Sequence, residues 1–281
     1  MRFKRINESV KVLTEDKTVN PGGTPYPNYG WCVIVCGGPG MGKSSVVKNL
    51  INIDAKHLDI DEVQALWLKT TSIDDGILTT ADGREYSMGA ENISEPYDLS
   101  NPKFTSFVHQ VTKPLAKNRQ KAFIKAAGNQ DKDKLPNVIF DITGDEIDKF
   151  MNIFDTVKPL GYKIAIVLVA GEISQAIEQN NLRSRHIDHD LLLNKHRNVL
   201  NTILNFFESS LVDEVDEFYV VVQFRVDIHT TEGKLKFLKT DNVYKVKQRG
   251  KQLLVPKNIQ HLLITEYEKL ISGIYDKDKT E

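Results

Sequence analysis

The stretch that decides the fold is "WCVIVCGGPGMGKSS", residues 31–45. Its first six residues are apolar and predict a buried strand, and the residues from Lys43 onward have the apolar spacing of a helix. The glycine-rich part between them fits the phosphate-binding pattern G-x-x-x-x-G-K-[ST], with Gly37, Gly42, Lys43 and Ser44 at the defining positions. A strand before the glycines and a helix after them is the context that this pattern requires.

Each residue type in this loop has a physical role in holding phosphate. Glycines adopt backbone conformations closed to other residues, so successive N–H groups can point at phosphate oxygens, and the following helix adds the positive end of its dipole. Lys43 would neutralise the β and γ phosphates of ATP, and Ser44 would bind Mg²⁺. The residues expected to contact the nucleotide are Gly37, Gly38, Pro39, Gly40, Met41, Gly42, Lys43, Ser44 and Ser45. The alternative is a glycine-rich turn with a solvated lysine.

Strands of nearly continuous Ile and Val alternate with helical patterns along the chain. This alternation predicts an α/β fold, a P-loop NTPase-type parallel sheet flanked by helices, with a small C-terminal β-hairpin and helix appended. Strands are expected at 31–36, 57–60, 137–142, 163–170 and 218–224, and helices at 43–53, 61–69, 103–127, 145–158, 172–182, 190–209 and 257–273. Parallel sheets place ligands at the carboxyl ends of their strands.

Composition shifts predict how the chain is divided. Residues 1–30 form an N-terminal arm and a linker rich in proline and glycine, and residues 31–224 form the main domain. Within that domain, residues 71–101 are polar and are expected to be an insertion, with a hairpin over 77–88 around Asp82-Gly83. Residues 225–281 are expected to form the β-rich appendage and last helix.

Bulk composition constrains the class of protein. The chain has 281 residues with 40% hydrophobic content and a formal net charge of -1, so charge alone neither implies nor excludes a nucleic-acid partner. The N-terminus lacks a signal-peptide pattern, and no apolar run reaches the length of about 18 residues that a membrane span needs. We therefore expect a soluble cytoplasmic protein without membrane partners.

Two cysteines, Cys32 and Cys36, lie in the first apolar run. On one strand they would be about 13 Å apart, too far for a disulfide. We expect buried free thiols.

Carboxylates after the second predicted strand are candidates for the acceptor side of the site. Asp59 and Asp61 lie in "HLDIDEVQALW", at a strand-to-helix junction. A carboxylate there could orient an attacking hydroxyl and accept its proton, and Asp61 is the better candidate for this base. The alternative for Asp61 is a helix cap, which is compatible with catalysis.

The third expected strand ends in "VIFDITG", residues 138–144, which contains Asp141 and Thr143. An acid at this position could assist in holding Mg²⁺ or could bind the acceptor; the alternative is a simple turn at the strand end.

The charged segment "NNLRSRHIDHD", residues 180–190, lies between two predicted helices. Arg183 and Arg185 could close over the triphosphate and offset charge on the transferring group, and Arg197 on the next helix could serve also. The alternative is a solvated turn. His186 and His189 suggest a metal site, but no further ligand cluster lies near them in the sequence.

Taken together, these motifs resemble the P-loop small-molecule and polynucleotide kinases, which include phage polynucleotide kinase and the zeta toxins. The resemblance covers roughly residues 31–224 and rests on "GGPGMGKSS", "DIDEV", "IFDITG" and "LRSR". It implies that Asp61 is the general base, that Asp141 and Thr143 contact the acceptor, and that Arg183 and Arg185 are lid arginines. The chain is also similar to kinases of large phages, some of which phosphorylate hydroxymethylated pyrimidines in DNA; for such a kinase the location would be the host cytoplasm.

The sequence departs from these kinases in places. Polynucleotide kinases usually carry an arginine three residues after the base, where this chain has Gln64, and neither 71–101 nor the segment after 225 has a counterpart. Three hypotheses follow: a kinase acting on a hydroxyl of a nucleotide or nucleic acid, a kinase of a sugar nucleotide, and a P-loop ATPase or nucleotide-gated adaptor without an acceptor.

The C-terminal segment is basic and carries aromatic residues. It could follow a nucleic-acid strand, or it could be a solvated hairpin edge protected by lysines. The residues concerned are Lys234, Lys236, Phe237, Lys239, Tyr244, Lys245, Lys247, Arg249, Lys251 and Lys257.

Overall fold

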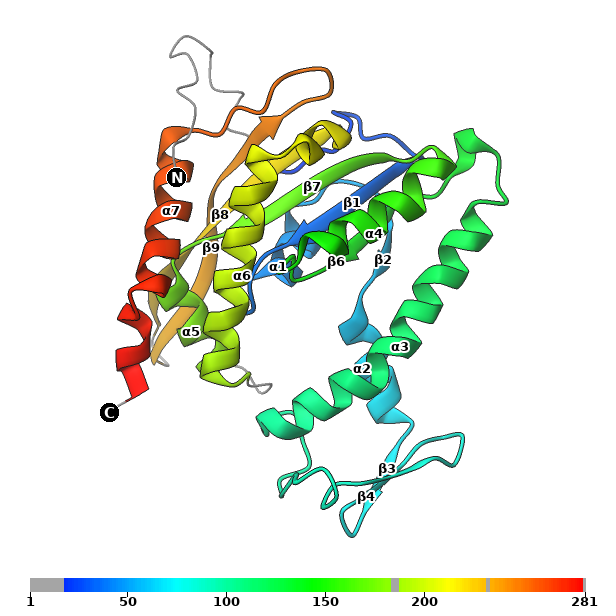
Figure 1. Ribbon diagram of the computed structural model, residues 1–281, viewed down its shortest axis with the longest axis vertical. Coiled ribbons are helices and arrows are strands. Elements are labelled where there is room, and N and C mark those ends of the chain that lie inside the picture. Colours follow the sequence, from blue (N-terminus) through cyan, green and yellow to red (C-terminus); the bar gives the residue numbers. More distant parts are fainter. Residues whose placement is uncertain (1–17, 183–186, 231–232, 280–281) are drawn as a thin grey trace.

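The apolar stretch at residues 31–36 forms β1 (Trp31–Cys36), and all six of its residues are buried. The computed structural model describes residues 18–182, 187–230 and 233–279 (Figure 1). The other strands of the sheet that contains β1 are β2 (Lys56–Leu58), β6 (Val138–Asp141), β7 (Lys163–Ala170), β8 (Glu217–Thr230) and β9 (Gly233–Lys247).

This sheet has six strands within the described residues, in the order β2-β6-β1-β7-β8-β9. The first five strands in this order are parallel, and β9 pairs antiparallel with β8. Continuous apolar runs are typical of parallel strands that are covered on both faces, and β7 is buried from its second residue to its last. The expected class, a mostly parallel P-loop-type sheet flanked by helices, is confirmed.

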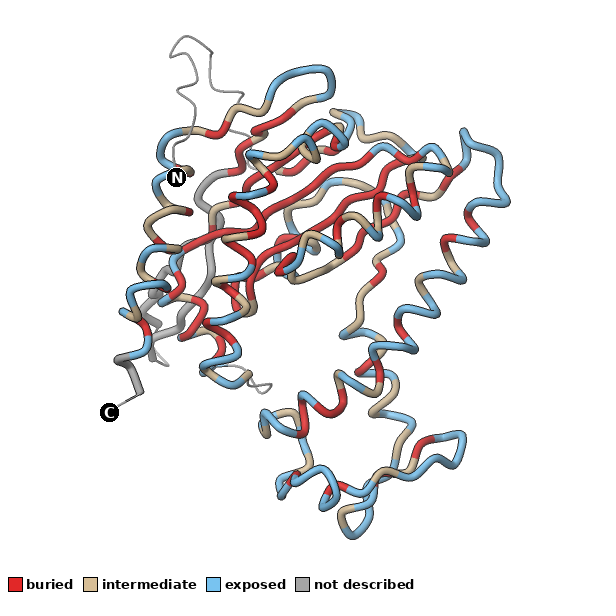
Figure 2. The backbone as a smooth tube through the Cα atoms, in the orientation of Figure 1, coloured by how far each residue is buried: buried red, intermediate tan, exposed pale blue. Residues whose placement is uncertain are grey.

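Helices alternate with the strands as expected. In Figure 1, α4 and α6 cross the face of the sheet that is turned to the viewer, and Figure 2 shows buried residues concentrated along the strands. The helices are α1 (Lys43–Asn49), α2 (Ile60–Lys69), α3 (Pro102–Ala127), α4 (Ile147–Val157), α5 (Ile173–Leu182), α6 (His189–Glu208) and α7 (Lys257–Ile271), with short 3₁₀ segments at Lys132–Lys134, Lys158–Leu160, Ser210–Glu214 and Ile274–Lys279.

Residues 60–113, which we call the outer lobe, have a hydrophobic cluster separate from that of the sheet. The expected hairpin is confirmed: β4 (Ile77–Thr79) pairs antiparallel with β5 (Glu85–Ser87). A third strand, β3 (Ser72–Asp74), pairs with β4 and was not predicted, because its three residues are exposed and too few to show a pattern. The cluster consists of Leu78, Met88, Ile93, Phe104, Phe107 and Val108.

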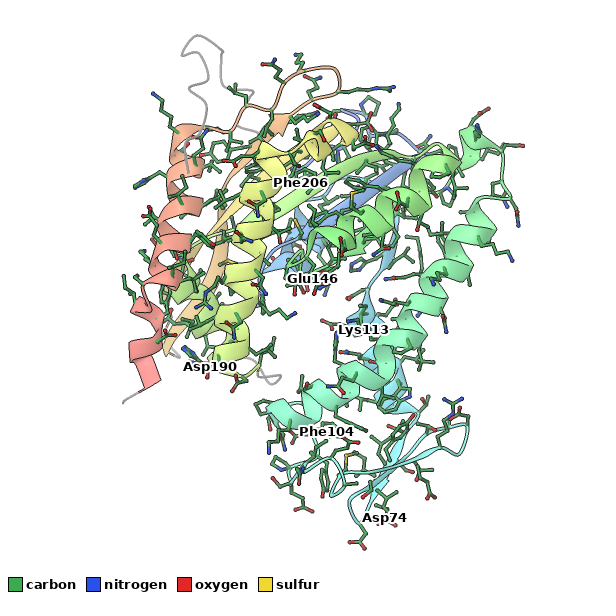
Figure 3. All side chains as sticks on the ribbon, viewed as in Figure 1. Asp74, Phe104, Lys113, Glu146, Asp190 and Phe206 are labelled. Carbon is green, nitrogen blue, oxygen red and sulfur yellow. The ribbon has the colours of Figure 1, made fainter. Side chains whose placement is uncertain are left out.

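Helix α3 connects the two clusters. Phe104, near its start, lies in the outer lobe, whereas Ile124, near its end, belongs to the core of the sheet. Figure 3 shows the labelled Phe104 in the lobe, well away from Phe206 in the main body. Pro114 lies inside the helix between these contacts, and α3 changes direction between its halves in Figure 1. A proline removes one helical hydrogen bond and bends the helix, which explains the change of direction.

The C-terminal hairpin is continuous with the main sheet. β8 extends to Thr230, so the domain boundary expected between residues 224 and 225 falls inside a strand. The alternating pattern after residue 224 predicts a β-rich appendage but not where it attaches, because a strand paired with an antiparallel neighbour has the same sequence periodicity wherever it is attached.

Part of the N-terminal arm packs on the sheet. Val19 is fully buried, and the Gly22 N–H donates to the Glu217 carboxylate over 3.0 Å. Cys32 and Cys36 are buried and free, as predicted. None of the helices in the described ranges has the length and apolar character required to cross a membrane.

Candidate functional site

The loop between β1 and α1 has the backbone conformation that the glycine pattern predicts. Gly40 has φ +81°, and a side chain added there would begin 2.5 Å from the Ala176 carbonyl oxygen. Gly42 is in the left-handed region, φ 82°, directly before the first residue of α1. Residues with a Cβ are strained in this region, so the loop depends on glycine at both positions. We call residues 37–43 the phosphate loop.

Lys43 folds back across the phosphate loop. Its Nζ donates to the Gly37 carbonyl over 3.0 Å and lies 4.0 Å from Oδ1 of Asp141, at the end of β6. Both side chains are largely buried, 16% and 11% exposed. The ammonium group therefore lies between Gly37, which follows β1, and Asp141, the last residue of the neighbouring parallel strand β6.

The carboxyl of Asp141 is electrostatically strained. Its pKa is raised to about 6, chiefly by burial; the charge of Lys43 lowers the pKa, and the charges of Asp59 and Asp61 raise it. Asp59 and Asp61 therefore lie close enough to Asp141 to affect its ionisation. The three carboxylates share the carboxyl edge of the sheet, where the sequence predicted them.

The loop after β6 is attached to the phosphate loop through its backbone. The Gly37 N–H donates to the Thr143 carbonyl over 3.1 Å, and the Ile142 N–H donates to the Val35 carbonyl over 2.9 Å. Thr143 contributes its carbonyl oxygen to this contact. Its hydroxyl remains a predicted contact to the acceptor.

The cap of α2 is Asp59 and not Asp61. The Asp59 carboxylate accepts the Asp61 N–H over 2.9 Å, and α2 begins at Ile60. The sequence alternative that placed Asp61 at the cap is wrong, because the helix begins one residue earlier than expected. Asp61 is exposed in the first turn, while burial raises the pKa of Asp59.

Two predicted residues of the phosphate loop lie at the start of α1. Ser44 and Ser45 are both exposed in its first turn, and the Ser45 hydroxyl accepts a hydrogen bond from Asn49 over 3.2 Å. Ser44 is thus exposed at the position where the phosphate-binding pattern places the Mg²⁺ ligand.

The structure does not bring Arg197 to the phosphate loop. Its guanidinium donates to the Leu270 carbonyl of α7 over 3.3 Å and to the Asn194 side chain over 2.9 Å. The reason is helical periodicity: the residue that faces the phosphate loop is the preceding one, His196. Arg183 and Arg185, the predicted lid arginines, and His186 lie outside the described residues.

His196 was missed by sequence reasoning. The residue is buried in α6, and its Nε2 lies 2.8 Å from the Pro39 carbonyl oxygen. Burial lowers the pKa of His196 to about 4, so the ring is neutral near pH 7.

A second group of side chains that the sequence did not predict is centred on Asp145, which follows the loop after β6. Its carboxylate is 1% exposed and accepts hydrogen bonds from Lys149 of α4 and Lys195 of α6. Burial opposes its ionisation, but these two lysines hold the pKa of Asp145 below its ordinary value. The group therefore joins α4 to α6 through one buried carboxylate.

Metal binding by protein side chains alone has no support in the described residues, where no group of three or more His, Cys, Asp or Glu side chains could hold an ion. His189, one of the two suggested ligands, is hydrogen-bonded through Nε2 to the Tyr275 carbonyl over 3.1 Å.

The described part of the basic C-terminal segment is engaged within the molecule. Lys245 pairs with Glu217 over 2.6 Å, Lys247 lies 3.5 Å from Asp213, and Arg249 lies 3.3 Å from Asp216. These three residues pair with carboxylates of the same molecule, and Lys247 is buried and not solvated as the hairpin-edge alternative expected. Lys234, Lys236, Phe237 and Lys239 lie where side chains are not described.

Comparison with known proteins shows the fold. A scan against protein-family models and a search of curated proteins both give no match. Among solved structures, a chain of the AvrRxo1-ORF1:-ORF2 complex with ATP is 11% identical with a TM-score of 0.52, and the match covers 86% of this chain and 63% of that one. A chain of the PezAT toxin-antitoxin system of Streptococcus pneumoniae is 10% identical with a TM-score of 0.47, over 88% of this chain and 87% of that one.

Proposed function

We propose that the protein is an ATP-dependent phosphotransferase that transfers the γ-phosphoryl group to a hydroxyl of a nucleotide or nucleic acid. The observation that carries the proposal is the position of Lys43. Its ammonium is held by the Gly37 carbonyl at 3.0 Å and faces the buried Asp141 at 4.0 Å, at the open side of a loop built on glycines. If the loop were a simple turn followed by a solvated lysine, we would expect the Lys43 side chain to be exposed and to lack these two contacts.

The donor side fits ATP with Mg²⁺. The backbone N–H groups of the phosphate loop and Lys43 would hold the phosphates, while Ser44 and Asp141 would hold the ion. Mg²⁺ usually keeps several waters and binds one or two carboxylates together with substrate phosphates, so a site with few protein ligands is the expected kind. When bound, the ion would neutralise charge on the transferring group. That the AvrRxo1 complex was solved with ATP supports the same donor.

The acceptor would bind where β2 of the main sheet joins α2 of the outer lobe. Asp59 and Asp61 are at this junction, and both influence the pKa of Asp141. Asp59 is occupied as the cap of α2, which leaves Asp61 as the candidate base. The outer lobe has its own core and could adapt to an acceptor without disturbing the sheet.

In the proposed reaction, Asp61 accepts the proton of the acceptor hydroxyl. A bond forms between that oxygen and the γ-phosphorus, while the bond from the γ-phosphorus to the β–γ bridging oxygen breaks and ADP leaves. Because the transition state is loose, catalysis comes mainly from positioning and charge neutralisation. Arg183 and Arg185 remain proposed lid residues on sequence grounds.

The test is incubation with γ-labelled ATP and a panel of acceptors: DNA with normal and hydroxymethylated bases, RNA ends, nucleosides and sugar nucleotides. Label on a nucleotide or nucleic acid, absent in the Lys43→Ala variant, is the expected result. Label on a sugar nucleotide alone would change the acceptor class. Release of labelled phosphate without a labelled acceptor would overturn the kinase assignment in favour of an ATPase.

A further inference from the structure

His196 is a buried polar side chain with a specific partner in the phosphate loop. It is 2% exposed and lies in α6, 157 residues away in sequence from Pro39, whose carbonyl oxygen is 2.8 Å from Nε2. A carbonyl oxygen can only accept a hydrogen bond, so Nε2 carries the proton and donates. The contact therefore fixes the ring tautomer and the direction of the Pro39 peptide together.

The ring also fills the space beside Gly38. A Cβ added to Gly38 would lie 2.1 to 2.6 Å from atoms of the His196 ring, well inside contact distance. The absence of a side chain at Gly38 therefore leaves the space that the imidazole ring of His196 occupies. The phosphate-binding pattern does not require this glycine, because it allows any residue at position 38.

The side chains that line the hollow beside the ring are mainly apolar, although the charges of Lys43 and Glu266 also act on the ring. The small hollow beside it is lined by side chains that include Met41, Val169, Val199 and Leu200. If the Pro39 carbonyl moved away, these side chains could not accept the N–H of the imidazole. A buried donor without a partner is unfavourable, so the hydrogen bond resists movement of the loop.

The phosphate loop is consequently held at two sides. On the side of β6, the Gly37 N–H donates to the Thr143 carbonyl over 3.1 Å, and on the side of α6, His196 holds Pro39. We propose that His196 is a positioning residue that sets the phosphate loop in its anion-binding conformation before nucleotide arrives. The inference rests on the proposed nucleotide site, and it assigns no contact between His196 and the nucleotide.

The test compares three variants of one helix. His196→Leu removes the donor, His196→Gln keeps an N–H near the position of Nε2, and His189→Leu is a matched control. His189, the first residue of α6, also donates to a carbonyl, that of Tyr275 over 3.1 Å. The first measurement is hydrogen exchange of a peptide covering residues 37–45 in the nucleotide-free protein, and the second is the Kd for ATP with Mg²⁺.

We expect faster exchange over residues 37–45 and about tenfold weaker ATP binding in His196→Leu, since losing one buried hydrogen bond has an effect of this order. His196→Gln should restore most of both, and His189→Leu should change neither. Wild-type exchange and affinity in His196→Leu would overturn the inference, as would equal losses in the Gln and Leu variants. If wild-type protein binds no ATP, the proposed function fails, while the exchange measurement still decides the role of His196.

Discussion

The donor and acceptor sides of the candidate site are built differently. The phosphate loop is a contiguous stretch held by buried contacts with β6 and α6, and Lys43 is 16% exposed. The acceptor side consists of separate carboxylates at a junction between the main sheet and the outer lobe, and Asp61 is exposed. This difference indicates that the fold determines where a phosphate would bind, whereas the acceptor would bind beside a lobe that has a hydrophobic cluster of its own.

The largest expected effect is on the donor side. Lys43→Ala should reduce phosphoryl transfer by about 10³-fold or more, because it removes the charge held at the mouth of the loop and leaves Asp141 without its cation. The measurement is initial rate with γ-labelled ATP. Lys48→Ala is the matched control, since Lys48 is exposed in the last turn of the same helix. Equal rates in the two variants would show that phosphoryl transfer does not need the charge of Lys43.

Substitution of Asp61 on the acceptor side should reduce turnover almost as much as Lys43→Ala does, but it should leave the affinity for nucleotide unchanged. Asp61→Asn should lower kcat by about 10² to 10³-fold, the range typical of a lost general base, and leave the Kd for ATP within about twofold. Single-turnover rates and equilibrium binding measured on the same protein separate the two quantities. Full transfer by Asp61→Asn would remove it from the base role.

Asp145 tests the connection between α4 and α6, the helix whose His196 contacts the phosphate loop. Asp145→Asn should destabilise the fold by about 1 to 3 kcal/mol at neutral pH, because Lys149 and Lys195 lose a buried carboxylate but remain partly exposed to water. The folded pKa of Asp145 is depressed, so its contribution is present above the ordinary value of 3.8 and is lost as pH falls through the folded value.

Urea unfolding of both proteins between pH 7 and pH 3 checks this prediction. The difference in unfolding free energy should narrow as pH falls below the ordinary value of 3.8. A difference independent of pH would mean that shape, and not charge, makes Asp145 important.

The conformation of the loop between β1 and α1 could be predicted because its information is local. β1, the glycines and Lys43 are consecutive, and an apolar run followed by that pattern leaves few possible conformations. The partners of the loop could not be predicted in this way. His196 reaches Pro39 across 157 residues and Lys195 reaches Asp145 across 50, and no periodicity in one sequence connects positions so far apart.

Errors at the acceptor side came from single-residue shifts. α2 begins at Ile60 and not at Asp61, and that shift moves the cap to Asp59. Helix ends are uncertain by one or two residues when inferred from a pattern, since several polar residues in succession can each serve as a cap. The prediction that Arg197 would lie near the phosphates is wrong for a related reason. One step along a helix turns a side chain by about 100°, so His196 faces the phosphate loop and Arg197 does not.

The smallest expected effect concerns Asp59 and separates the two acceptor carboxylates. Asp59→Ala should lower the unfolding free energy by about 1 kcal/mol, since it removes the cap that accepts the Asp61 N–H over 2.9 Å. Asp59→Asn should be close to neutral, because asparagine caps a helix equally well and the burial that raises the pKa of Asp59 no longer acts on a charge. If Asp59 only caps α2, Asp59→Asn should also keep most of the turnover, in contrast to Asp61→Asn. A stable Asp59→Asn protein that binds ATP but transfers no phosphoryl group would reverse the assignment and make Asp59 the base.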